Sequence, residues 1–235
     1  YQVSHNHRNN SDPDSKSHKK KNNEWKNLKG FFNENGYDHR LNTIPGDGDC
    51  FFTSIANIAN AHDDMVPLRD GLNLGGDAGQ FNQQDIRGYI AGRQTYMYMN
   101  GQITNLRMLY DDITNKDFDS LIPLHNDDEW ADELVRLTQG DRWGINSDLV
   151  LFNEDLNKKL CVIIFSDDMI IYPNNFEQTT KYVGFIYYNG KNHYQTLDIK
   201  KDTVDDFTSV MRCSDLPKFL VNYIRKLGYT FKCLS

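Results

Sequence analysis

Apolar residues are distributed unevenly along this chain of 235 residues. Residues 1 to 23 contain only Tyr1 and Val3 as apolar positions, too few to offset the entropy cost of ordering the backbone. We therefore predict that residues 1 to 23 form a flexible polar tail. From residue 24 to residue 235, apolar positions follow patterns typical of helices and strands, and we expect one folded domain there.

Helical spacing is clearest after a glycine-containing turn at residues 46 to 48. In CFFTSIANIANAH, from residue 50, apolar residues recur at spacings of three and four, which predicts a helix with one buried face. The segment LKGFFNENGY before it predicts a helix or turn, and residues 61 to 79, rich in glycine and aspartate, predict a loop. Further helices are predicted in QFNQQDIRGYIAGRQTYMYMNG, DEWADELVRLTQ, NSDLVLFNEDLNKK and PKFLVNYIRKLG, the last near residues 216 to 228.

Strand patterns dominate the stretch after the third of these helices. The runs KLCVIIFS, MIIYP and YVGFIYY are rich in β-branched and aromatic residues and are separated by Asp, Asn, Pro and Gly. An Asn189-Gly190 turn then precedes a strand that carries His193 and Tyr194. Helices followed by a group of strands predict an α+β domain with a small central sheet flanked by helices.

Composition narrows the classes of partner. The tail holds five basic and two acidic residues, so the remainder has 21 basic against 31 acidic residues and a net charge of about −10. This acidity argues against nucleic-acid binding, which needs clustered positive charge. The longest apolar runs are far below the ~18 residues of a membrane span. We expect a soluble monomer that needs no cofactor or metal and whose partner is a protein.

The four cysteines, Cys50, Cys161, Cys213 and Cys233, form no CxxC pair and no Cys/His group with zinc-site spacing. A reducing compartment, the cytoplasm, is the simpler prediction for such a chain. If the protein is a secreted effector, the cytosol of a host cell is the corresponding expectation.

The most specific chemical feature is GDGDC at residues 46 to 50. Gly46 and Gly48 permit tight turns or positive φ, and such a turn can direct the amides of Gly48, Asp49 and Cys50 toward one point, as an oxyanion hole requires. A cysteine in the first helical turn is expected to have a lowered pKa. We expect Asp47 to brace the loop and Asp49 to cap the helix. An Asp-Gly turn that happens to precede a buried cysteine is an equally weighted alternative.

His193 is the candidate base for Cys50. A thiol nucleophile needs a nearby imidazole to accept its proton and then to protonate the leaving amine, and a strand holds the ring firmly. Taken alone, a histidine beside a hairpin is more often structural, and the pairing with Cys50 favours the catalytic interpretation.

Three segments in order resemble the OTU (ovarian tumour) family of cysteine proteases. GDGDCFF resembles the family's DG-x-C-[LF]-[FY] loop, NHY resembles its histidine strand, and GDRWGINSDLVLFNEDLNKKLCVII resembles its W-G helix leading into a core strand. The resemblance covers residues 36 to 198. It implies the OTU-type, papain-like fold and cleavage of isopeptide bonds at the ubiquitin C-terminus, with Cys50 as nucleophile and His193 as general base. It also implies that Asp47 and the amides of the 47 to 50 turn are oxyanion-hole elements.

One position departs from the family pattern. OTU proteases usually have Asp or Asn two residues after the histidine, whereas this chain has Gln195. The amide oxygen of Gln195 could accept a hydrogen bond from the ring, so Gln195 is the first choice for the third catalytic residue. Asn192 and Asp38 are the alternatives.

These observations lead to a deubiquitinase hypothesis with two rivals. Ubiquitin or polyubiquitin is the expected partner, and we expect its binding surface within residues 65 to 140. The first rival is a catalytically weak OTU-like module that binds ubiquitin, favoured by Gln195. The second is a thiol hydrolase acting on another ubiquitin-like or protein substrate. Trp143 is expected to be a packing anchor, and Tyr96, Met97, Tyr98 and Met99 are expected in the core or partly on the surface.

Overall fold

The structure, a computed structural model, describes residues 28–61, 80–102, 127–145, 148–149, 151–152, 160–167, 169–172, 177–228 and 230–233. The predicted tail at residues 1 to 23 lies outside these residues, as does nearly all of the predicted loop at residues 61 to 79.

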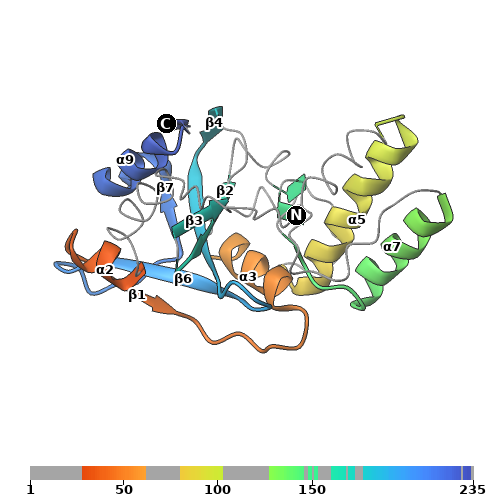
Figure 1. Cartoon of the computed structure of the whole chain (residues 1–235), viewed down its shortest axis with the longest axis horizontal. Coiled ribbons are helices and arrows are strands. Elements are labelled where there is room, and N and C mark those ends of the chain that lie inside the picture. Colours follow the sequence, from red (N-terminus) through yellow and green to blue (C-terminus); the bar gives the residue numbers. More distant parts are fainter. Residues whose placement is uncertain are drawn as a thin grey trace, which may run out of the picture.

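A mixed sheet forms the centre of the described part of the chain (Figure 1). Its main path runs β1 (Tyr37–Leu41), β6 (Tyr194–Lys201), β5 (Tyr182–Tyr188), β2 (Leu160–Ser166) and β3 (Met169–Tyr172), and β7 (Val210–Arg212) also pairs with β5. β2 and β5 are parallel, while the other pairs in this sheet are antiparallel. The predicted strands in KLCVIIFS, MIIYP and YVGFIYY are confirmed.

Both faces of this sheet are covered. On β2, Val162 and Ile164 pack into one core with α3 (Cys50–Ala59) and α5 (Gln83–Met99), whereas Ile163 and Phe165 pack into the other. The second core includes α2 (Leu28–Asn33) and α9 (Lys218–Lys226). Because successive strand residues point to opposite faces, a run such as LCVIIF can be buried throughout. The fold is therefore α+β, with the sheet between two groups of helices.

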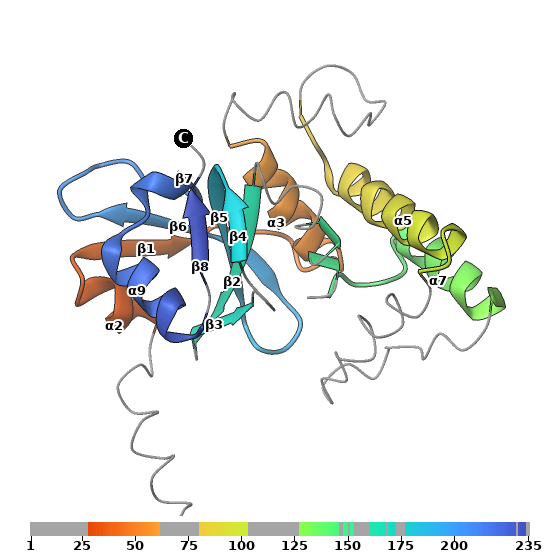
Figure 2. The ribbon, with the colours of Figure 1, turned by 90° about the horizontal axis from the view of Figure 1, so that it is seen from above.

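The helices on the α3 side extend away from the sheet. α5 and α7 (Asp127–Gln139) lie beyond α3, on the side opposite α2 and α9 (Figure 2). α5 begins with a capping box in which Asn82 and Asp85 each accept from the other's amide. These helices are confirmed, whereas the predicted helix in NSDLVLFNEDLNKK is described only at residues 148–149 and 151–152, which are helical.

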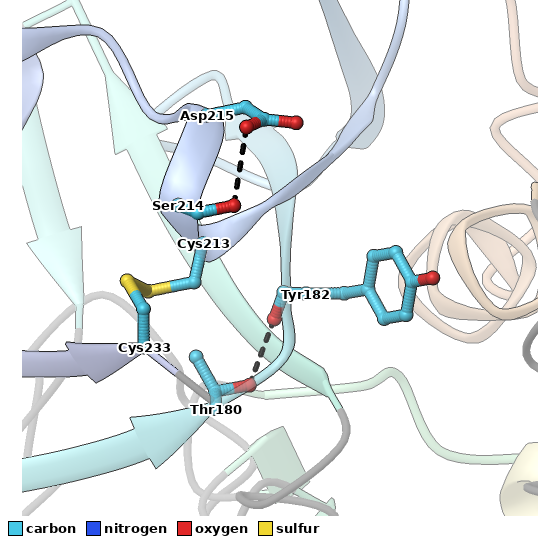
Figure 3. The surroundings of a disulfide bond; sticks show 6 residues. All are labelled: Thr180, Tyr182, Cys213, Ser214, Asp215 and Cys233. Atoms are coloured by element: carbon cyan, nitrogen blue, oxygen red, sulfur yellow. Dashed lines mark hydrogen bonds between the residues drawn. A yellow bond between two sulfur atoms is a disulfide. The ribbon is translucent and has the colours of Figure 1, made fainter. Parts of the chain in front are cut away.

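A short parallel pair, β4 (Glu177–Thr180) and β8 (Thr230–Cys233), lies outside the main sheet. A disulfide joins Cys233 to Cys213 in the 3-10 helix η2 (Cys213–Asp215), as Figure 3 shows. The cysteines form no CxxC pair in the sequence and no disulfide was predicted, so this bond was missed. Disulfides persist mainly in oxidising compartments, and the cytoplasmic location stays a prediction.

Among the described residues, no helix combines the length and apolar character that crossing a membrane requires.

Candidate active site

The Cys50 sulfur lies at the point where α3 meets the start of β6. Cys50 is the first residue of α3 and is only 5% exposed. The Tyr194 amide donates to its Sγ at 3.4 Å, and Sγ lies 3.9 Å from the Asn192 carbonyl oxygen. The sulfur thus contacts the backbone on both sides of His193, and two segments that the sequence analysis paired are brought together.

His193 immediately precedes β6, so it lies one residue before the strand on which it was predicted. Its side chain is partly exposed. A Cβ atom built on Gly46 would lie 3.9 Å from His193 Nδ1, which places the ring against the loop that leads to Cys50. The imidazole and the thiol are therefore carried by adjoining backbone segments.

A tight turn fixes the backbone of His193. The side-chain oxygen of Asn189 accepts hydrogen bonds from the amides of Lys191, Asn192 and His193 at 2.9, 3.0 and 3.0 Å. The Asn189 amide donates to the His193 carbonyl at 3.1 Å, and Gly190 has a φ of +76°. The Asn-Gly turn was predicted from the sequence, but this role of Asn189 was missed, although Asn side chains often accept from nearby amides in turns.

Aromatic packing holds the start of β6 against α3. The Tyr194 ring is buried, edge-on to Phe51 at 5.0 Å and stacked on Tyr188 at 4.5 Å. Because Phe51 and Tyr194 directly follow Cys50 and His193, this contact couples the positions of the two candidate catalytic residues.

The loop before Cys50 matches its predicted role only in part. Gly48 has a φ of +91°, which favours glycine, and a Cβ there would also lie 3.0 Å from Trp143 Nε1. Gly46, in contrast, is not among the residues with positive φ. Asp47 braces the loop as predicted, because its carboxylate accepts from the Asp49 amide at 3.1 Å. This bond occupies one of the three amides proposed for the oxyanion hole and leaves those of Gly48 and Cys50.

Asp49 occupies the N-cap position of α3, but its side chain makes no capping hydrogen bond, contrary to the prediction. The carboxylate instead pairs with Arg87 of α5, at 2.8 Å from Nε and 2.5 Å from Nη2. The Asp49 carboxylate is only 27% exposed, and a hydrogen bond to the charged guanidinium is stronger than one to a neutral backbone amide.

Burial raises the pKa of the Cys50 thiol above its ordinary value of 9.0, and the Asp47 carboxylate adds to this effect. The amides of Tyr194, Phe51 and Cys50 act in the opposite direction, because they stabilise the thiolate. The predicted lowering of this pKa is therefore wrong, because loss of hydration outweighs the hydrogen bonds from these backbone amides.

Gln195 lies two residues after His193, near the end of the β1 strand. Its Nε2 donates to the Asn42 carbonyl oxygen at 2.9 Å. Of the alternatives, Asp38 lies opposite Lys200 in the pairing of β1 with β6. Lys200 is seven residues beyond His193, so Asp38 is more than about 20 Å from His193 along the strand. The Asn192 side-chain oxygen accepts from the Asn189 amide group at 3.4 Å. Asp38 is excluded by position, whereas Gln195 stays close to the histidine.

A buried ionic cluster supports the same region. Arg142 makes two 2.7 Å hydrogen bonds to Asp148 and also pairs with Glu133 of α7. Burial nevertheless raises the pKa of Glu133, with Arg142 acting to lower it. Trp143, next to Arg142, is 49% exposed, and its indole lies against Gly48, so it packs on the loop before Cys50 from the surface. Of the aromatic and methionine run in α5, Met97 is buried, while Tyr96 and Met99 are exposed.

No group of three or more His, Cys, Asp or Glu residues in the described segments is placed to hold a metal ion.

No protein-family model and no curated protein sequence matches the chain. Several solved structures resemble it distantly. An OTU domain in complex with ubiquitin has a TM-score of 0.41 and 15% identity, covering 83% of this chain and 91% of that one. An OTU protease from Farallon virus gives 0.39 and 14%, covering 69% and 85%. An OTU deubiquitinase from Wolbachia pipientis wMel gives 0.35 and 14%, covering 72% and 91%.

Proposed function

We propose that this protein is a thiol hydrolase that cleaves isopeptide bonds at the ubiquitin C-terminus, with Cys50 as nucleophile and His193 as general base. The observation that supports the proposal is the contact between the Cys50 sulfur and the Tyr194 amide, which joins Cys50 to the residue that follows His193, 144 residues away in sequence. The substrate class follows from the three segments that resemble OTU proteases.

The reaction begins with transfer of the Cys50 proton to His193 and attack of the thiolate on the carbonyl carbon of the ubiquitin C-terminal glycine. The amides of Gly48 and Cys50 are the donors proposed for the resulting oxyanion. His193 then protonates the lysine amine as the carbon–nitrogen bond breaks. Water, deprotonated by His193, hydrolyses the thioester and regenerates the thiol.

Gln195 is proposed to orient the imidazole. A carbonyl oxygen only accepts hydrogen bonds, so the Gln195 atom 2.9 Å from the Asn42 carbonyl is the amide nitrogen. The Gln195 oxygen is thereby left to accept from another donor. Side chains two residues apart along an extended chain lie on the same side, and we propose that the Gln195 oxygen accepts from the His193 ring.

The test uses ubiquitin with a thiol-reactive group at its C-terminus. We expect a single covalent adduct on Cys50, located by mass spectrometry, that is abolished in Cys50→Ala and strongly slowed in His193→Ala. Gln195→Ala should slow the adduct less than His193→Ala does. An adduct on Cys161, or one that persists in Cys50→Ala, would contradict the proposal.

A ubiquitin-binding module without activity is the second candidate, favoured by the raised pKa of the Cys50 thiol. Ubiquitin binding without adduct formation in the wild-type protein would support this candidate. Absence of both binding and adduct would reject ubiquitin as the substrate and leave hydrolysis of another protein substrate to be tested.

A further inference from the structure

Arg87 of α5 has a fully buried side chain, which is rare for a guanidinium group. All five of its N–H groups have acceptors. Nε and Nη2 donate to Asp49 Oδ1, and Nη2 also donates to the Gly48 carbonyl at 3.4 Å. Nη1 donates to the carbonyls of Leu137 at 2.9 Å and Arg142 at 2.8 Å. This complete set of acceptors offsets the cost of removing the charge from water.

The flat face of the same guanidinium lies over the Phe52 ring, 3.9 Å from its centroid. Arg87 therefore contacts residues on both sides of Cys50: Gly48 and Asp49 before it and Phe52 after it. Its other two acceptors are the carbonyls of Leu137, in the last turn of α7, and of Arg142, just after α7. Arg87 therefore joins the loop before Cys50 to the α5 and α7 helices.

We propose that Arg87 is a positioning residue for the nucleophile: it holds the Gly48–Asp49 backbone beside Cys50 and keeps the Asp49 carboxylate paired and directed away from the sulfur. This inference rests on the proposed function for the role of Cys50 as nucleophile. It assigns Arg87 no contact with substrate.

The charges around the sulfur explain why this pairing matters. Asp47 lies in the loop before Cys50 and raises the pKa of the thiol, while the Tyr194 amide lowers it. His193 is the cationic partner after proton transfer. Asp49 is adjacent to Cys50 in sequence, and Arg87 offsets its charge. Without Arg87, a second uncompensated carboxylate would oppose formation of the thiolate.

The experiment measures the rate constant for alkylation of Cys50 by iodoacetamide between pH 7 and 9, in the full chain. The variants are Arg87→Met, Asp49→Asn, the double variant, and Arg87→Lys, which keeps the charge but has only three donors and no planar face. Cys50→Ser gives the background from other thiols, and circular dichroism confirms folding. Ubiquitin is not needed, so absence of the ubiquitin adduct in wild type would reject the proposed function without bearing on this test.

Arg87→Met should react about tenfold more slowly than wild type at each pH, since one uncompensated carboxylate shifts a neighbouring pKa by about one pH unit or more. The double variant should recover most of the wild-type rate, because the opposing charge is gone. Arg87→Lys should react more slowly than wild type and faster than Arg87→Met.

A purely structural role predicts a different result, because loosening the loop would expose the sulfur and speed alkylation. Wild-type or faster rates in Arg87→Met and Arg87→Lys would overturn the proposal, as would a slow rate that Asp49→Asn does not restore. If Arg87→Met does not fold, Arg87→Lys decides on the same criterion: a slower rate supports the proposal, and an equal or faster rate overturns it.

Discussion

Gly144 is the position where one added methyl group should do the most damage to the candidate site. Gly144 is buried, and a Cβ built there would lie 2.5 Å from Cβ of Phe51 and closer still to its Cγ and Cδ1. Non-bonded carbon atoms prefer separations of about 3.5 to 4.0 Å, so one of the two segments must move by roughly 1 Å. Phe51 is fully buried and follows Cys50, which means that the displacement reaches Cys50.

We expect Gly144→Ala to lower the free energy of unfolding by about 1 to 3 kcal/mol, the usual cost of overpacking a core. Urea unfolding followed by circular dichroism measures this change. At equal folded fraction, the rate of adduct formation with reactive ubiquitin should fall about 10- to 100-fold, as expected for a misplacement near 1 Å.

Two matched glycine variants separate the causes. Gly184→Ala in β5 also clashes, with Ile58 Cγ2 at 2.5 Å, and should lower stability without a comparable loss of adduct rate at equal folded fraction. Gly92→Ala on the exposed side of α5 meets no atom within 4 Å and should raise stability by up to about 1 kcal/mol. Wild-type stability in Gly144→Ala would refute the packing argument for this segment.

Three further predictions concern the histidine turn, the thiol and the disulfide. Asn189→Ala removes the acceptor of three amides, so it should lower the unfolding free energy by about 1 to 3 kcal/mol and slow formation of the ubiquitin adduct. Asn189→Asp keeps an acceptor and should restore most of the stability and of the adduct rate. Equal defects in the two variants would contradict this role. Because burial raises the pKa of Cys50 above its ordinary value of 9.0, the neutral thiol predominates below that pH. The rate constant for alkylation by iodoacetamide should therefore keep increasing up to pH 9. A rate constant that is already constant near pH 7 would show that the thiolate has formed and would contradict this prediction. Cys233→Ser opens a loop of 20 residues and should lower the unfolding free energy by about 3 kcal/mol in oxidised protein, with no difference from wild type after reduction; a difference that survives reduction would point to the side chain itself.

The sequence predicts the buried elements of the fold better than its edges. The strands β2 and β5 are identifiable because both faces of each are covered, which demands continuous apolar runs. β1 was missed because its sequence, YDHRL, pairs only with β6 and alternates between partly and fully exposed positions. An edge strand of this kind carries no apolar pattern.

At the candidate site, local motifs single out Cys50 and His193 and miss the residues that hold the loop and turn around them. Cys50 and His193 stand out because glycines and a turn flank them. Arg87 acts through an ion pair 38 residues away in sequence, and that distance is set by the packing of α5 on α3. Arg87 could have been noticed because it lies three, four and seven residues before Ile90, Ala91 and Gln94, and therefore on the buried face of α5. The Cys213–Cys233 bond could not be found, because spacing alone does not determine which cysteines pair.

The contact between Cys50 and Tyr194 also has a consequence for how the protein is made. The sulfur acquires its neighbours only after β6 has been synthesised and has paired with β5, since those neighbours come from residues 192 and 194. Contacts so distant in sequence close late in folding, because the entropy of a long loop must be overcome first. A nascent or truncated chain that ends before His193 therefore contains Cys50 without its proposed base, and we expect such a chain to lack the proposed hydrolase activity.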